Sequence, residues 1–296
     1  MPVHKLPISV IVLAFNEEAN IAACLDTIVD WAGEVFIVDS GSTDRTLSII
    51  SQYGAQVVHH PFENYSRQRN WAQASLPLTH QWVFHIDADE RVSPLLIGEL
   101  RQLFATAPMG GATAGFLVRR RIKFLGRSIT HGGLYPTYHR RLFKKELGHC
   151  EDREYDQHFI VEGETKTIEA DLVEITASSL FSWTARHNKW AQMEASQLTK
   201  ADQAEQSNMV KARFSGSPIE RRRWLRSRFY GRAPLFARAV MYFLTRYLLR
   251  GGFLDGTPGL IYHFLQGFWF RFYVDACYYE LLQKRKPFAS IDKSEI

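Results

Sequence analysis

Cysteine is scarce in this sequence, and its pattern excludes two kinds of stabilising chemistry. Cys24, Cys150 and Cys277 are the three cysteines among 296 residues, and they lie far apart without C-x-x-C spacing. An odd number of widely separated cysteines predicts neither a disulfide framework nor a zinc site. The first apolar run, residues 8–15, is followed at once by an acidic stretch, so it is too short for a signal peptide. We therefore expect reduced thiols and a cytoplasmic location.

Glycine is missing from the place where many nucleotide-binding sheets carry a phosphate loop. The turn after the first apolar run is AFNEEAN, which holds no glycine and no Lys-Ser or Lys-Thr pair. This excludes the G-x-G-x-x-G dinucleotide motif and the P-loop. We expect any bound phosphate to be held through a metal ion instead.

Long uncharged apolar runs are also absent, although the last third of the chain is rich in aromatics. The formal net charge is +5, and most of the excess lies in residues 211–296, where arginines interrupt each apolar stretch. No stretch there is long enough to span a bilayer. Basic, aromatic, amphipathic helices are typical of the membrane interface and attract anionic headgroups. We expect a peripheral membrane anchor; a helical oligomer interface is the alternative. Nucleic-acid binding is disfavoured because no nucleic-acid motif accompanies the arginines.

The first 60 residues alternate between apolar runs and amphipathic segments. Ile8–Phe15, Glu34–Val38 and Ala55–His59 have the β-branched, apolar character of buried strands. Glu17–Trp31 and Thr43–Tyr53 have helical spacing. The order β-α-β-α-β predicts an open α/β sheet.

Polar side chains follow three of the predicted strands, where ligands of such sheets bind. Asn16 and Glu17 follow the first strand, Asp39 follows the second, and Asp87 and Asp89 follow the apolar run of VFHIDADER. Asp-x-Asp is often only turn chemistry or a helix cap. At a strand end facing other polar residues it indicates a site for Mg²⁺ or Mn²⁺, which prefer carboxylate and phosphate oxygens.

Four motifs in order, ISVIVLAFNEE, VFIVDSGSTDRT, NYSRQRNWA and WVFHIDADER, resemble the nucleotide-sugar-binding half of family-2 glycosyltransferases. That family has the GT-A fold, a Rossmann-like and mostly parallel sheet flanked by helices. The resemblance implies that Asp87 and Asp89 hold a metal ion that bridges to the donor diphosphate. It also implies donor contacts from Phe15, Asn16, Glu17, Asp39, Gln68, Arg69 and Asn70.

The acceptor side is expected further along the chain. LYPTYHRRLF, with Tyr135 and Arg141, resembles the stretch that precedes the acceptor site in bacterial lipopolysaccharide-core family-2 transferases. An inverting transferase needs a general base, and the His-Glu pair of related sequences falls here on Asp156 and Gln157. We expect Asp156 to be the base, with Glu154 and Glu151 in reserve.

Weaker patterns cover the middle of the chain. Residues 162–174 predict a pair of strands, and residues 178–206 a long helix. We divide the chain into a catalytic GT-A domain and a basic helical region, with these bounds: 1–210 (1–105 for the nucleotide sugar, 106–210 for acceptor and base) and 211–296.

The expected function is that of an inverting, metal-dependent hexosyltransferase. It would move a sugar from a nucleotide-diphosphate sugar to a hydroxyl of a lipid-linked or lipopolysaccharide-type glycan at the inner membrane face. Two alternatives stay open. A sugar nucleotidyltransferase is disfavoured because AFNEEAN lacks a glycine-rich phosphate loop. A non-catalytic sugar-nucleotide-binding module is kept because Gln157 cannot act as a base.

Overall fold

The computed structural model describes residues 5–106, 111–153, 156–176, 179–201, 210, 212–228, 230 and 233–285. Its strands are β1 Leu6–Ala14, β2 Ala32–Asp39, β3 Gln56–His59, β4 Trp82–Asp87, β5 Glu90–Val92, β6 Thr113–Phe124, β7 Arg127–Ile129, β8 Thr137–Lys144, β9 Gly148–Cys150, β10 Phe159–Val161 and β11 Glu164–Ile175. Its α-helices are α1 Ile21–Leu25, α2 Thr46–Ile50, α3 Tyr65–Ser75, α4 Pro94–Thr106, α5 Leu180–Ala201, α6 Pro218–Arg228, α7 Ala237–Leu244, α8 Gly256–Tyr262 and α9 Phe270–Arg285. The predicted β-α-β-α-β order of the first 60 residues is confirmed.

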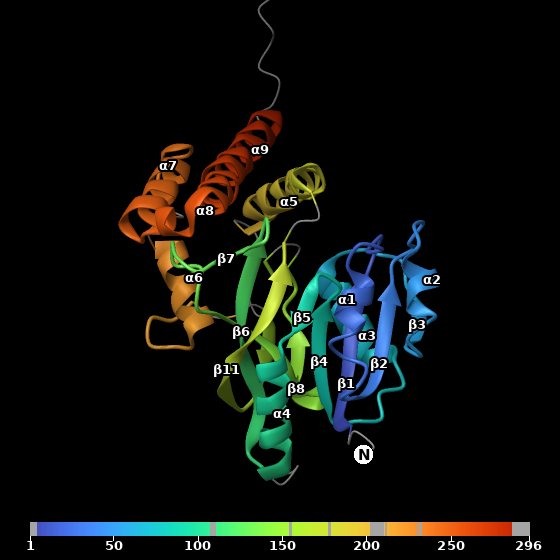
Figure 1. The fold of residues 1–296 in the computed structure, drawn as a ribbon. Coiled ribbons are helices and arrows are strands. Elements are labelled where there is room, and N and C mark those ends of the chain that lie inside the picture. Colours follow the sequence, from blue (N-terminus) through green and yellow to red (C-terminus); the bar gives the residue numbers. More distant parts are fainter. Residues whose placement is uncertain are drawn as a thin grey trace, which may run out of the picture.

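One mixed sheet organises the molecule (Figure 1). Its strands run in the order β3-β2-β1-β4-β8-β6-β11-β5, and β7 pairs with β6. The strands β3, β2, β1 and β4 are parallel to one another, whereas β8 is antiparallel to both of its neighbours. The parallel half therefore brings the carboxyl ends of β1, β2 and β4 to one edge, where ligands of such sheets bind.

The apolar run of β1 is explained by burial on both faces of the sheet. Val10 and Val12 pack into the core that also holds Trp31 of the segment before β2, while Ile11 between them points into the core formed with Ala72 of α3. Side chains alternate across a strand, so a strand covered on both faces needs apolar residues at nearly every position.

The Asp-x-Asp segment begins at the last residue of β4 and continues into a turn. β4 ends at Asp87 and β5 begins at Glu90, so Ala88 and Asp89 form a turn between them. The two carboxylates are thus freed from strand alternation, which would have sent them to opposite faces.

Three predicted elements differ from the structure. Regular α-helix covers only Thr46–Ile50 of the predicted helix 43–53. Regular α-helix covers only Ile21–Leu25 of the predicted helix 17–31, because the following bonds, such as Thr27 N to Cys24 O, close turns of i→i+3 type. The predicted strand pair in residues 162–174 is wrong. Glu164–Ile175 is one strand that pairs in parallel with β6.

The predicted helical character of the C-terminal region is confirmed. α7 to α9 are joined by π-helical segments at Thr245–Leu249 and His263–Trp269 and by a 3₁₀ turn at Gly252–Asp255. These helices gather beside α5, at the end of the sheet away from the N-terminus (Figure 1). Trp183 of α5 and Tyr262 of α8 pack against Phe124 of β6.

Within the described residues, none of the helices combines the length and apolar character needed to cross a membrane. Cys24, Cys150 and Cys277 are free and buried.

Candidate active site

A single cavity joins the sheet edge to the C-terminal helices. It has a volume of about 1750 Å³, and side chains from β1, β4, β6, β8, α5, α6, α7 and the π-helical segments line it. Of the sequence-predicted residues, the cavity wall includes Phe15, Glu17, Gln68, Arg69, Asp87, Asp89, Arg141 and Asp156. The structure therefore brings these eight predicted residues into one space.

The turns after β1 and β2 are bound to each other. Asn16 adopts a left-handed backbone conformation (φ 53°), and its Oδ1 accepts a hydrogen bond from the Thr43 amide at 2.8 Å. Both carboxylate oxygens of Asp39 accept bonds from the Ser42 amide, and Oδ2 also accepts from the Gly41 amide. Asn16 and the buried Asp39 thus lie behind this end of the cavity, while Phe15 and Gly41 form part of its wall.

Two side chains of helix α3 have different roles: Gln68 lines the cavity, and Asn70 attaches the helix to β9. Gln68 is fully buried, and its Nε2 donates to Ser40 Oγ and to the His60 carbonyl. Asn70 faces the other way and exchanges two hydrogen bonds with the backbone of Cys150. Asn70 therefore attaches α3 to β9 and does not reach the cavity wall.

Asp87 is clamped between two arginines. Nη2 of Arg69 lies 2.6 Å from its Oδ1, and Nη2 of Arg141 lies 2.8 Å from its Oδ2. Arg141 also contacts Glu90 at 3.1 Å, and Glu90 in turn accepts the Asp87 amide. Burial alone would raise the pKa of Asp87, but the two guanidinium groups hold it well below its usual range. Asp87 is therefore ionised at neutral pH.

The pKa of Asp89 is shifted in the opposite direction to that of Asp87. Burial, together with the neighbouring carboxylates of Glu174, Asp87 and Glu17, raises the pKa of Asp89 well above its usual value, and Arg186 offsets this in part. A buried carboxylate among other acids gains most from a cation.

These residues fit a hard divalent ion. Carboxylate oxygens are its preferred ligands, and Asp89 points into the cavity with no guanidinium in hydrogen-bond contact. Among the residues that the structure describes, no cluster of three or more His, Cys, Asp or Glu side chains forms a complete metal cage. That donor set suits an ion of the Mg²⁺ kind, which commonly takes one or two carboxylates and completes its shell with substrate phosphates and water.

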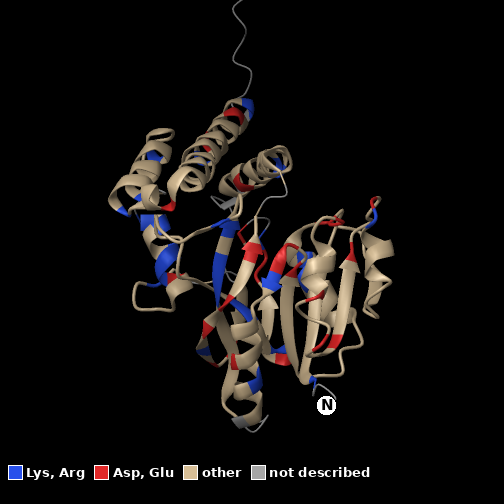
Figure 2. Ribbon diagram, viewed as in Figure 1, with Lys and Arg blue, Asp and Glu red and all other residues tan. Residues whose placement is uncertain are grey.

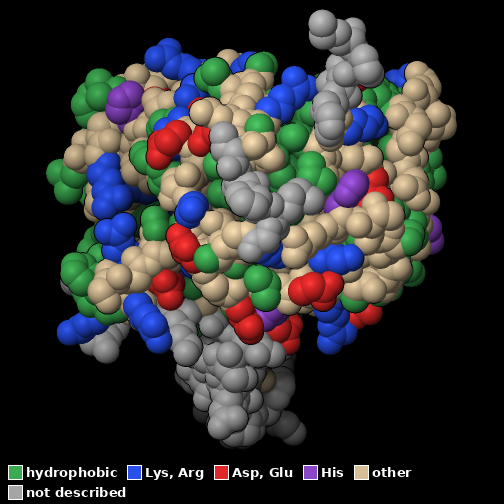
Figure 3. Space-filling view, turned by 90° about the horizontal axis from the view of Figure 1, so that it is seen from below, with side chains coloured by type: hydrophobic (Ala, Val, Ile, Leu, Met, Phe, Trp, Pro, Cys, Tyr) green, Lys and Arg blue, Asp and Glu red, His purple; other side chains and the backbone are tan. Residues whose placement is uncertain are grey.

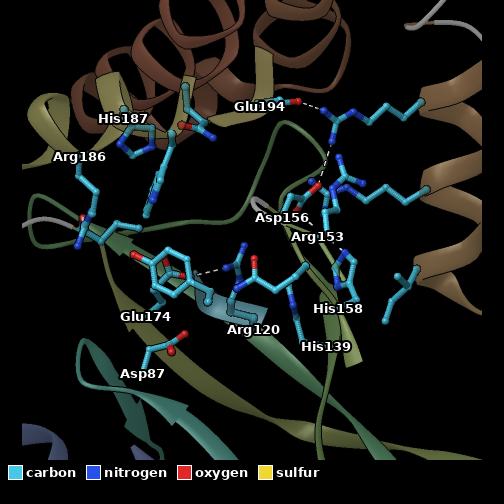
Figure 4. A pocket seen from close by; sticks show the side chains of 18 of the residues that line it. Asp87, Arg120, His139, Arg153, Asp156, His158, Glu174, Arg186, His187 and Glu194 are labelled. Atoms are coloured by element: carbon cyan, nitrogen blue, oxygen red, sulfur yellow. Dashed lines mark hydrogen bonds and ion pairs between the residues drawn. The ribbon is translucent and has the colours of Figure 1, made fainter. Parts of the chain in front are cut away.

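Asp156 stands on the opposite wall, in a loop before β10. Its Oδ2 lies 3.0 Å from Nη1 of Arg226, and its Oδ1 lies 4.0 Å from Nε2 of His158. Figure 4 shows Asp156 and Glu194 joined through one side chain of α6, which is Arg226. Burial would raise the pKa of Asp156, but His158, Arg226 and further arginines hold it well below its usual range.

The two reserve bases have other positions. Glu151 is fully buried, is bound by both terminal nitrogens of Arg223 and accepts the His158 and Val210 amides. It therefore ties α6 to the sheet and has no free oxygen to accept a substrate proton. Glu154 lies outside the described residues.

Of the two predicted acceptor-side residues, Arg141 lines the cavity and Tyr135 does not. Arg141 reaches the cavity, as described above. The hydroxyl of Tyr135 donates to Asp171 at 3.1 Å, and its ring lies under Arg119 and Arg121. Tyr135 is thus held among side chains of β6 and β11 and does not line the cavity.

The sequence analysis missed several residues of the site. Arg120 of β6 pairs with Glu174 of β11 at 2.7 Å in the centre of the cavity (Figure 4). Arg186 of α5 lies above Asp89. The sequence signal for these residues is weak, because alternation along a strand does not single out Glu174 and helical spacing does not single out Arg186.

The basic residues of the C-terminal region turn largely inward. Arg222, Arg223, Arg226, Arg246 and Arg271 line the cavity, although the sequence analysis assigned the basic character of this region to lipid headgroups. Figure 2 shows that Lys and Arg occupy much of the ribbon of α6. On the face seen in Figure 3, by contrast, charges of both signs are interspersed with apolar side chains.

Comparison with known proteins gives three findings. The sequence model of Glycosyl transferase family 2 matches residues 9–155. The lipopolysaccharide core biosynthesis glycosyltransferase LpsC of Rhizobium meliloti is 26% identical over 279 residues, covering 89% of this chain and 91% of the relative. An uncharacterized glycosyltransferase of Rickettsia felis is 36% identical over 99 residues, covering 33% of this chain and 34% of that relative.

Among solved structures, a mannosyltransferase from Pyrobaculum calidifontis in complex with GDP-Man and Mn²⁺ is similar, with a TM-score of 0.54. The match covers 96% of this chain and 89% of the other, at 17% identity. At that identity the likeness establishes the fold and nothing finer.

Proposed function

Since this chain is a family 2 glycosyltransferase, with the family domain at residues 9–155, we propose that it transfers a sugar, with inversion, from a nucleotide-diphosphate sugar to a hydroxyl of a lipid-linked or lipopolysaccharide-type glycan. The observation that carries this proposal is the shared cavity. Asp87 and Asp89 stand on one wall of it and Asp156 on the other.

The donor would lie against the carboxyl ends of β1, β2 and β4. Phe15 and Glu17 border the nucleoside end, and Arg69 supplies a guanidinium for the phosphates. Asp89 would hold Mg²⁺ or Mn²⁺, with Asp87 as a second ligand only if it shares its oxygens with Arg69 and Arg141. When bound, such an ion would neutralise charge on the departing diphosphate.

In the transfer step, the acceptor hydroxyl oxygen bonds to the anomeric carbon as the bond from that carbon to the diphosphate oxygen breaks. The electron pair stays with the diphosphate, and the hydroxyl proton goes to Asp156. A carboxylate with a strongly lowered pKa is a weak base. Proton transfer therefore requires Arg226 to release Asp156, and Glu194, which Arg226 also contacts, offers it a second carboxylate.

Binding of the donor is the first test. We expect one nucleotide-diphosphate sugar, from a panel assayed by calorimetry with and without Mn²⁺ or Mg²⁺, to bind with metal dependence. A ligand at one hundred times its dissociation constant stabilises the native state by about 2.7 kcal/mol, so a thermal shift should report the same ligand. No binding by any member in folded protein would contradict the proposal. Donor binding without transfer to any lipopolysaccharide fraction would favour a binding module. Release of inorganic diphosphate from a nucleoside triphosphate and a sugar 1-phosphate would favour a nucleotidyltransferase.

We also propose that the C-terminal helices rest on the cytoplasmic membrane surface. Leu248, Leu249, Phe253 and Leu254 are more than half exposed around the π-helical segment and the 3₁₀ turn. Exposed apolar side chains of this density are typical of membrane or protein contacts. We expect the protein to co-sediment with lipid vesicles and Leu249→Glu to reduce this. Vesicle-independent self-association that Leu249→Glu abolishes would indicate an oligomer interface instead.

A further inference from the structure

The cavity is far more basic than the chain as a whole. Thirteen arginines line it against six Asp and Glu residues, whereas the formal net charge of the full chain is +5. Several of these arginines are paired, as described for Arg69, Arg141 and Arg226. The pairing is not uniform along the cavity, and the part next to the C-terminal helices is the least compensated.

Tyr242 of α7 lies in the part of the cavity next to the C-terminal helices. Nη1 of Arg246 donates to its hydroxyl at 2.9 Å, and the guanidinium groups of Arg246 and Arg271 lie 5.1 and 5.7 Å from its ring centre. Arg222 and Arg226 of α6 line the same cavity, and their charges act on Tyr242. Burial would raise the pKa of Tyr242, but Arg246, Arg271, Arg222 and Arg226 together lower it to about 7. Four positive charges therefore act on one phenol.

Carboxylates do not balance these four charges. Arg226 and Arg271 share Glu194, and Arg226 also contacts Asp156. Across the described parts of the chain, neither Arg222 nor Arg246 forms an ion pair with a carboxylate.

Arg246 is also incompletely hydrogen-bonded. Its side chain is buried, with 5% of the residue exposed, and its Nε donates to the Gly132 carbonyl. Its Nη2 has no hydrogen-bond partner among the described residues. A buried donor without a partner is costly, and a guanidinium cannot become neutral by losing its proton. An anion from outside the chain would relieve both deficits.

We propose that Arg222, Arg246 and the Tyr242 hydroxyl form a subsite for an anionic group, a phosphate or a carboxylate, carried by the acceptor glycan. The inference rests on the proposed transferase function and specifies its acceptor class. The subsite lies on helices of the C-terminal region, whereas the donor residues lie at the ends of β1, β2 and β4. Guanidinium groups suit both anions because they donate in a planar fork.

The experiment is calorimetry with three sugar probes on the full chain saturated with Mn²⁺ and its nucleoside diphosphate, so that the donor phosphate site is filled. The probes are glucose 6-phosphate, glucuronate and neutral glucose. Arg222→Met is the main variant because the Arg222 side chain makes no hydrogen bond or ion pair within the described residues, so its loss should not impair folding. Arg246→Lys keeps the charge but removes the fork, and Arg101→Gln, on the exposed face of α4, is the matched control.

We expect at least one anionic probe to bind about tenfold more tightly than glucose, and Arg222→Met to remove most of that difference. Arg101→Gln should have no effect, and Arg246→Lys should weaken the anionic probes alone. Preference for glucose 6-phosphate assigns a phosphate, and preference for glucuronate a carboxylate. Equal binding of charged and neutral probes would overturn the subsite.

Two further outcomes separate this inference from the proposed function. If Arg222→Met weakens the nucleoside diphosphate and leaves the sugar probes unchanged, the arginines serve the donor and the acceptor subsite is wrong. If the wild-type protein binds no nucleoside diphosphate at all, the proposed function itself fails, whatever the probes do.

Discussion

Oδ2 of Asp89 lies 3.9 Å from Nη1 of Arg186, close enough for attraction but beyond hydrogen-bond distance. This spacing differs from that of Asp87, whose two oxygens are both in direct contact with arginine. Two carboxylates separated by one residue are thus kept in different states. Asp87 is neutralised by two arginines, whereas Asp89 has no guanidinium of the described residues in hydrogen-bond contact.

Asp89→Asn should abolish metal-dependent donor binding. An amide removes the negative charge that the ion needs but keeps the shape of the side chain, so the fold should persist. We expect turnover to fall by at least about 100-fold, the scale seen when one charge-stabilising group is removed from an active site. Donor calorimetry with Mn²⁺ and steady-state rates test this. Asp30→Asn, at an exposed position, is the control, and unchanged turnover in Asp89→Asn would refute the metal role.

Asp87→Ala should destabilise the fold as well as the site. The substitution leaves Arg69, whose side chain is 5% exposed, without its carboxylate partner. Removing one partner of a buried ion pair typically costs about 3–5 kcal/mol. Urea denaturation should show a loss of this order. The double variant Asp87→Ala/Arg69→Met should recover part of it, because the orphaned charge is also gone. A loss of less than about 1 kcal/mol in the single variant would contradict this account.

Asp156→Asn should lower kcat and leave donor binding unchanged. The amide cannot take the acceptor proton, and general-base catalysis typically contributes about 10²–10⁴-fold. Steady-state kinetics with saturating donor and nucleotide calorimetry measure the two effects separately. Asp152→Asn, at an exposed position four residues earlier, is the control. If Asp156→Asn keeps its full kcat, Asp156 is not the base and another group takes the acceptor proton.

The sequence indicated which residues follow the parallel strands because that placement depends on local pattern. Buried parallel strands have a continuous apolar signature, and the residues that follow them meet at one edge whatever the rest of the chain does. Asp87 and Asp89 were found in this way. Asn70 and Tyr135 were expected near substrates, but each bonds a group far along the chain, Cys150 and Asp171. No local pattern indicates such partners.

The contacts of the C-terminal arginines were also beyond prediction from local sequence. Composition correctly predicted basic, amphipathic helices there, but composition does not tell which way a charged face points. Arg223 is directed at Glu151, seventy-two positions earlier, and Arg238 at Asp275 of α9. Because a buried guanidinium must find an anion or stay uncompensated, the tertiary fold decides whether such a residue faces lipid, carboxylate or substrate.

Tyr242 should titrate far below an ordinary tyrosine. Its pKa is about 7 in the folded protein because the surrounding arginines outweigh the effect of burial, and it returns to about 10 on unfolding. Since the folded value is the lower one, ionisation of Tyr242 stabilises the fold above about pH 10 in full, and this contribution is lost as the pH falls through about 7. Absorbance at the tyrosinate band, titrated from about pH 5 to 9, should show one early transition that Tyr242→Phe removes. Arg222→Met should move that transition to higher pH, because one of the four charges that favour the phenolate is gone. If wild type and Tyr242→Phe differ only near pH 10, the positive field at this end of the cavity is much weaker than the arrangement of its arginines implies.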